Sequence, residues 1–108
     1  MPIDLPQPIA DYFTADAEDR GSVDQCFTEA ATVTDEANTY VGRTEIRRWK
    51  AEVSSKFSYV SEPFALEHDG DRFIVTSRVS GTFRGSPIDL RYGFVLDGDK
   101  IARLEIVP

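Results

Sequence analysis

The hydrophobic periodicity of this 108-residue chain changes near Phe57, and that change limits the folds it can adopt. Before Phe57 the apolar residues recur mainly at the spacing of an α-helix, about 3.6 residues, whereas later they alternate with polar residues as in a β-strand. Helices followed by strands predict an α+β domain with an antiparallel sheet, because a parallel sheet would need strands and helices to alternate along the chain.

Two of the expected helices precede residue 27. The first begins after Pro8 and ends at Gly21, and its apolar face consists of Ile9, Tyr12, Phe13 and Ala17. The second begins at Ser22, because Ser22 and Gln25 have the spacing of a capping box.

A third, longer helix is expected to begin near Gly42. Its apolar face consists of Ile46, Trp49, Val53 and Phe57. We expect Trp49 to point inward. The rest of this helix is expected to be a solvated outer surface, formed by Arg47, Arg48, Lys50 and Glu52.

A short strand ending at Asp35 precedes the third helix. Four strands follow that helix, at residues 60–68, 73–83, 90–96 and 102–106. Two connections, Asp69-Gly70 and Asp97-Gly98, carry a strong hairpin signal, since Gly accepts positive φ. Pro63 predicts a bulge or a strand edge. The sequence thus predicts one domain over residues 1–108, with three N-terminal helices packed on one face of a curved antiparallel sheet.

Charge and composition exclude several classes of partner. The net charge of −7 disfavours nucleic acid and anionic membranes, because their phosphates attract Lys and Arg. No apolar run reaches about 18 residues, so we expect no membrane span. The first residues lack the basic and apolar regions of a signal peptide, and the single cysteine, Cys26, suits a reducing compartment. We therefore expect a cytoplasmic protein.

Asp35 occupies an unusual position for a charged residue. Ala31, Val33 and Asp35 lie on one face of their strand, because strand side chains alternate. A carboxylate in this apolar phase is costly unless it is paired, hydrogen-bonded or protonated. Asp35 is therefore either a general base or polar anchor at an apolar pocket, or a strand-end residue that caps the turn at residues 35–38. Periodicity alone leaves both alternatives open.

Several elements follow one another in a characteristic order along the first half of the chain. They are Tyr12-Phe13, Phe27 at the end of the second helix, Ala30-Ala31-Thr32-Val33, Asp35, and Gly42-Arg43-Thr44-Glu45-Ile46 at the start of the third. This order resembles the nuclear transport factor 2-like superfamily, in particular its SnoaL-like polyketide cyclase and ketosteroid isomerase branches. The resemblance spans nearly the whole chain. It implies a cone-shaped fold with a cavity between sheet and helices, and a homodimer formed through the open sheet face that carries Arg78, Arg91 and Arg103.

The resemblance also implies roles for single residues. It places the catalytic base at Asp35 and the donor to a developing oxyanion at Tyr12, with Phe13 as the neighbour that could face the cavity instead. From the residues alone, Tyr12 is equally well explained as a core aromatic. Asp89, the acid nearest to the second oxyanion donor of the isomerases, is out of register. The SnoaL-like branch, which needs one acid/base residue and a shaped pocket, therefore fits better.

The remaining candidates concern the ligand. His68 continues an apolar strand phase and is the alternative proton partner of Asp35, although a lone histidine is usually structural. The aromatic residues expected to bind the ligand are Phe13, Trp49, Phe73, Tyr92 and Phe94, and filling of the core is the alternative for most of them. No residues have metal-ligand or phosphate-loop spacing, so we expect no metal and no cofactor.

Two functions are consistent with these features. The first is binding of a small apolar or aromatic ligand in a cavity, with Asp35 carrying out cofactor-free isomerisation, cyclisation or dehydration. The second is a non-catalytic ligand-binding or dimerisation module in which Asp35 only caps a turn. The two differ in whether the Asp35 carboxylate lies in the wall of an open pocket.

Overall fold

The computed structural model describes residues 3–18 and 20–108. The helices are α1 (Gln7–Glu18), a 3-10 helix η1 (Arg20–Cys26) and α2 (Gly42–Lys56). The strands of the described residues are β1 (Phe27–Asp35), β2 (Asn38–Val41), β3 (Tyr59–Asp69), β4 (Arg72–Gly81), β5 (Ile88–Asp97) and β6 (Lys100–Val107). The predicted α+β class is confirmed.

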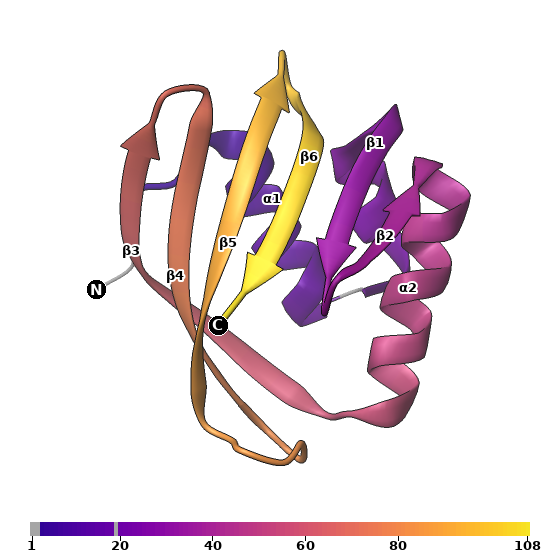
Figure 1. The fold of residues 1–108 in the computed structure, drawn as a ribbon, viewed down its shortest axis with the longest axis vertical. Coiled ribbons are helices and arrows are strands. Elements are labelled where there is room, and N and C mark those ends of the chain that lie inside the picture. The colour runs from indigo at the N-terminus through magenta and orange to yellow at the C-terminus, as the bar shows by residue number, and fades with distance from the viewer. Residues whose placement is uncertain (1–2, 19) are drawn as a thin grey trace.

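All of these strands belong to one curved sheet with the order β2-β1-β6-β5-β4-β3 (Figure 1). Neighbouring strands are antiparallel except β1 and β6, which run in the same direction. The expectation of a purely antiparallel sheet is therefore wrong at this pair. Its members are far apart in sequence, so no hairpin turn fixes their relative direction.

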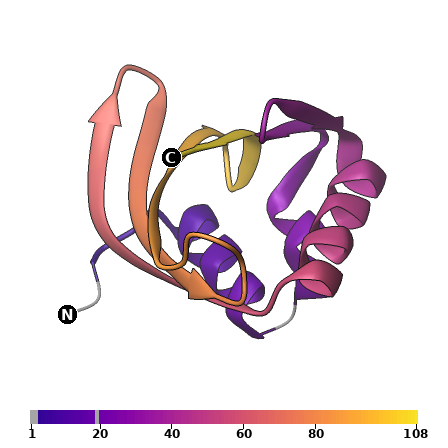
Figure 2. The same cartoon turned by 60° about the horizontal axis from the view of Figure 1, so that its bottom comes forward.

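The helices cover only one face of the sheet. Figure 2 shows α1 inside the curve of the sheet and α2 beside the end formed by β1 and β2. The expectation of three α-helices is wrong, because the described residues contain two and the second expected helix is η1. This seven-residue connection contains Gly21 and Ser22, which are weak helix formers, and short segments favour the tighter 3-10 form. No helix in the described part is long and apolar enough to cross a membrane.

The neighbourhood of β1 also differs from expectation. Phe27, expected at the end of the second helix, is the fully buried first residue of β1. Residues 38–41, where the sequence predicted no strand, form β2, which pairs with β1 across a turn at Glu36 and Ala37. Both turn residues have positive φ, 52° and 67°. Because neither is Gly or Asn, the usual sequence signal for such a turn is absent.

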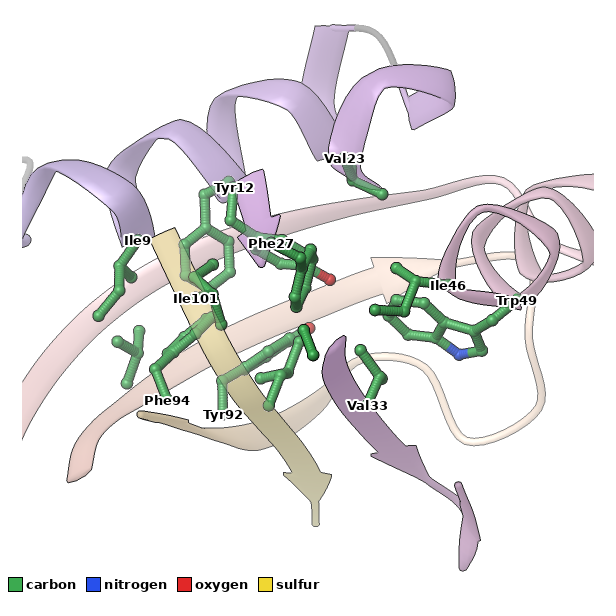
Figure 3. Packing of buried hydrophobic residues seen from close by; sticks show 14 residues of the cluster. Ile9, Tyr12, Val23, Phe27, Val33, Ile46, Trp49, Tyr92, Phe94 and Ile101 are labelled. Carbon is green, nitrogen blue, oxygen red and sulfur yellow. The ribbon is translucent and has the colours of Figure 1, made fainter. Parts of the chain in front are cut away.

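The core lies between the helices and the concave face of the sheet (Figure 3). Tyr12 of α1 packs edge to face on Phe27 and Phe94, with ring centres 6.0 Å and 5.7 Å away. Ile46 and Trp49 of α2 point to the side where Val33 of β1 lies, and Trp49 is only 2% exposed. The prediction that Trp49 points inward is confirmed.

The predicted irregularity and hairpin turns of the strands are present. The register between β3 and β4 shifts between Pro63 and Ala65, as the proline indicated. Gly70 and Gly98 have positive φ, 64° and 62°, at the two Asp-Gly turns.

We expect Gly98→Ala to lower the free energy of unfolding by about 1–2 kcal/mol, because an L-residue with a Cβ is strained in this left-handed conformation. The added methyl group would meet no atom within 4 Å, so the effect isolates backbone strain. Urea unfolding measures it, with the neighbouring Asp99→Ala as control. Equal stabilities of the two variants would contradict the prediction.

Candidate active site

A cavity of about 730 Å³ lies between α2 and the inner face of the sheet. Its apolar lining includes Val53 of α2 with Val79, Leu90 and Ile106 of β4, β5 and β6. Its polar lining includes Asp35 and Lys50, together with tyrosines from α1, β2, β3 and β5. The volume lies in the range of small-molecule sites, roughly 300–1,000 Å³.

Asp35 is the last residue of β1 and lines this cavity. It is half-buried, in phase with the buried Ala31 and Val33. The indole Nε1 of Trp49 donates a hydrogen bond to its Oδ2 over 3.0 Å, and Tyr40 packs on the indole with ring centres 6.1 Å apart. Among the residues that the structure describes, the hydrogen bond recorded for this carboxylate comes from a side chain and not from the backbone of the following turn.

A hydrogen-bonded cluster connects α1, α2 and β3 at another part of the cavity. The Lys50 ammonium group donates to Tyr12 Oη at 3.0 Å, to Asp16 Oδ1 at 3.0 Å and to Tyr59 Oη at 3.2 Å. Tyr59 in turn donates to Asp16 Oδ1 over 2.7 Å. We name these four residues the Lys50 cluster.

The Lys50 cluster corrects the expectation that Lys50 belongs to a solvated surface, since this residue is only 3% exposed. The physical reason is helical phase: Lys50 follows Ile46 by four residues, on the buried side of α2. Asp16 follows Ile9 by seven residues, about two turns of α1, so it also lies on the buried side of its helix, and it is 4% exposed. Ala17, expected on that face, is exposed. A polar residue at an apolar position of the helical repeat was the sequence signal that could have identified both buried residues.

The indole of Trp49 lies between the two charged parts of the site. Lys50 Nζ is 4.3 Å from the centre of the indole ring, in cation–π geometry, while the indole nitrogen binds Asp35. The ammonium group also lies 5.2 Å from the Tyr12 ring and 5.9 Å from the Tyr59 ring. Aromatic faces stabilise a cation in this arrangement.

Two tyrosines of the cavity stay protonated over a wide pH range. Burial, and then the nearby Asp16 carboxylate, raise the pKa of Tyr12 well above its ordinary value. Burial raises the pKa of Tyr92 as well, although its hydrogen bond with Ser61 partly opposes this. Both phenols are therefore present as neutral hydroxyl groups at neutral pH.

The structure divides the residues predicted from sequence into two groups. Asp35, Tyr12, Trp49 and Tyr92 line the cavity. Four others do not, namely Phe13, Phe73, Phe94 and His68.

The four residues outside the lining have evident packing roles. Phe13 and Phe94 are part of the core, with ring centres 6.0 Å apart. The exposed His68 stacks on Phe73 with ring centres 4.3 Å apart. Alternation along a strand identifies the inward face, but not how far along it the cavity extends. Within the described residues, no group of three or more His, Cys, Asp and Glu side chains could hold a metal ion.

Sequence reasoning did not identify the other end of the lining, where apolar and charged side chains meet. Phe57 follows α2, and Phe83 and Ile88 belong to the connection and start of β5; the two phenylalanine rings are in edge-to-face contact at 6.2 Å. The lining also includes exposed charged residues, namely Glu36, Glu52, Lys56 and Arg84.

The chain matches the SnoaL-like domain over residues 9–104. A candidate polyketide cyclase from Sinorhizobium meliloti is 40% identical, with a TM-score of 0.90 and 96% of each chain covered. A protein with a ketosteroid isomerase-like fold from Catenulispora acidiphila, in complex with trimethylamine, is 18% identical; its TM-score is 0.83, with 97% of this chain and 87% of that chain covered.

TerC, co-crystallised with polyporic acid, is 17% identical, with a TM-score of 0.78 and 95% and 91% of the two chains covered. At these lower identities the likeness shows the fold. None of the curated proteins compared with this chain matches it. With a match that extends over residues 9–104 and a close structural relative, the chain belongs to the SnoaL-like domain family.

Proposed function

We propose that this protein catalyses cofactor-free proton transfer on a small, mostly apolar ligand, with Asp35 as the acid/base group. The observation that carries the proposal is the position of its carboxylate, which lines the cavity and accepts a hydrogen bond from the buried Trp49 at 3.0 Å. A carboxylate held in place within reach of a bound ligand is suited to take up and return a proton. Isomerisation, cyclisation and dehydration all need such a step.

The proposed ligand is a small apolar or aromatic molecule. The cavity volume of about 730 Å³ and the aliphatic wall of Val53, Val79, Leu90 and Ile106 support this class. The 40% identity to a candidate polyketide cyclase and the polyporic acid bound by TerC point in the same direction.

Tyr59 is better placed than the two predicted proton partners of Asp35. Tyr12 lines the cavity but is fully buried, and its hydroxyl oxygen accepts the Lys50 hydrogen bond. His68 lies outside the lining. Tyr59 is half-buried and lines the cavity. We therefore propose that Tyr59 contacts the ligand and that Tyr12 acts through Lys50.

Deuterium exchange tests the proposal without knowledge of the substrate. A panel of cyclic ketones and polyporic acid is first screened by thermal shift, since binding to the folded state raises the melting temperature. Stabilising ligands are then followed by NMR in D₂O. We expect at least one to exchange an acidic C–H proton faster with the protein than without it. Ligands that bind with no exchange at all would favour a non-catalytic ligand-binding module.

We also propose that the protein is a homodimer through the outer face of the sheet. In Figure 1, α1 lies behind the sheet and α2 beside its β2 edge. The opposite face carries Arg72, Arg78, Arg91 and Arg103 next to Asp89 and Glu105. Two ion pairs, Arg78–Asp89 at 2.6 Å and Arg72–Glu105 at 3.7 Å, show that both signs of charge meet there. Such a mixed face can be self-complementary across a two-fold axis.

Sedimentation equilibrium is expected to give twice the chain mass of 12.1 kDa. Arg91→Glu on the outer sheet face should shift the equilibrium to the monomer, whereas Arg48→Glu on the exposed side of α2 should leave it unchanged. A monomer for the native chain at tens of micromolar concentration would refute the dimer.

A further inference from the structure

The ion pair of Lys50 and Asp16 is not explained by the role proposed for Asp35. Both side chains are buried, with 4% and 5% of their surface exposed, and Nζ lies 3.0 Å from Oδ1. Removing two charges from water is costly, and apolar residues of similar volume often serve stability as well or better. A stabilising role is therefore a weak reason for this pair to be here. Its place beside a cavity suggests a role in binding or catalysis.

The ion pair has a definite orientation toward the cavity. Lys50 is one of the lining residues, whereas Asp16 is not. Asp16 lies behind the ammonium group on α1, where it also accepts the hydrogen bond of Tyr59. Of the two members of the pair, only Lys50 belongs to the cavity wall.

The Trp49 indole sets the relation between Lys50 and Asp35. The ammonium group lies over the face of this ring, 4.3 Å from its centre, and the carboxylate lies at its edge, 3.0 Å from the ring nitrogen. A negative and a positive group thus line one cavity with a single indole ring between them.

We propose that Lys50 is the electropositive partner of Asp35: it attracts an electron-rich oxygen of the ligand and stabilises the negative charge that develops on that oxygen. This inference rests on the proposed proton transfer at Asp35 and adds a second residue to it. Asp16 is a positioning residue, which holds Lys50 in the cavity wall.

The step is balanced without a co-reactant. Asp35 takes a proton from a carbon next to the ligand's carbonyl group, the C–H electron pair forms a C=C bond, and the carbonyl π pair moves to oxygen. The resulting enolate oxygen lies at Lys50. Asp35 then returns the proton to a carbon of the same ligand. An opposite charge a few Å away favours the ionised form of such an oxygen.

The test uses 4-nitrophenol, whose ionised form absorbs visible light, as a probe for an anionic oxygen. It is titrated with pH in the presence of the native protein and of the Asp16→Asn/Lys50→Met double variant, which removes both charges together and leaves neither unpaired. We expect the native protein to prefer the phenolate over the phenol by at least about 10-fold relative to the double variant. Lys50→Arg, which keeps the charge, should retain a preference for the phenolate.

A measurement on the native protein alone also tests the inference if the double variant does not fold. The ionisation midpoint of bound 4-nitrophenol should lie below that of the free compound. No saturable binding, no lowered midpoint, or equal phenolate preference in the native protein and a folded double variant would each overturn the inference.

The binding assay separates failure of this inference from failure of the proposed function. If Asp35→Asn loses deuterium exchange but the native protein shows no phenolate preference, Asp35 remains the proposed base and the role proposed for Lys50 is refuted. If the native protein prefers the phenolate but exchanges no ligand proton, Lys50 remains the proposed oxygen-binding group and the proposed catalysis is refuted.

Discussion

Asp35→Asn is expected to lower ligand C–H exchange by at least about 100-fold while the fold and ligand binding are retained. Asparagine has the same shape as aspartate. Its amide oxygen can still accept the hydrogen bond from Trp49 Nε1, which is 3.0 Å long in the native protein. It cannot take up a proton at neutral pH. NMR in D₂O measures the exchange rate, and the melting temperature reports on the fold.

The matched control is Asp89→Asn. Asp89 pairs with Arg78 on the outer face of the sheet and does not line the cavity. Its replacement should leave the exchange rate unchanged. An active Asp35→Asn variant would contradict the assignment of Asp35 and favour a ligand-binding module.

Lys50→Met is expected to cost about 3–5 kcal/mol in the free energy of unfolding, because it breaks the buried ion pair of Lys50 with Asp16. Methionine is nearly as long as lysine, so lost packing contributes little. The Asp16→Asn/Lys50→Met double variant should recover most of this stability, since the charge is removed with its partner. Denaturant unfolding at pH 7 measures all three proteins.

Arg48→Met is the control for Lys50→Met. Arg48 lies on the same helix and is exposed, so its replacement should change stability by no more than about 0.5 kcal/mol. If Lys50→Met is as stable as Arg48→Met, the ammonium group is not a buried partner of Asp16. If the double variant is no more stable than the single one, loss of the Lys50–Asp16 ion pair is not the cause of the destabilisation.

Much of the fold could be predicted because it depends on local pattern. The two Asp-Gly turns, the bulge at Pro63 and the inward direction of Trp49 each follow from a few neighbouring residues. The second strand of the first hairpin and the parallel pairing of β1 with β6 could not be predicted in this way. The turn at Glu36 and Ala37 lacks the usual residues, and the β1–β6 pair joins segments that lie about 70 positions apart.

The sequence predicted the cavity-lining Asp35 but not the ion pair of Asp16 and Lys50. Asp35 was found because a charge in an apolar strand phase stands out against strict alternation. Asp16 and Lys50 are equally out of place in helical phase, but a helix face is broad, and Ala17 and Phe57 gave an apolar stripe without them. The two charges lie on different helices, so the residue spacing within one helix does not show that they form a pair.

Trp49 is the only tryptophan in the chain, and this gives the protein an optical reporter at its own site. Its emission comes from a ring with an ammonium group over one face and a carboxylate at the nitrogen edge. Indole emission depends on nearby charge and on access of water. Occupation of the cavity, replacement of the carboxylate and neutralisation of the ammonium group should therefore each give a different spectrum, from a protein that carries no label.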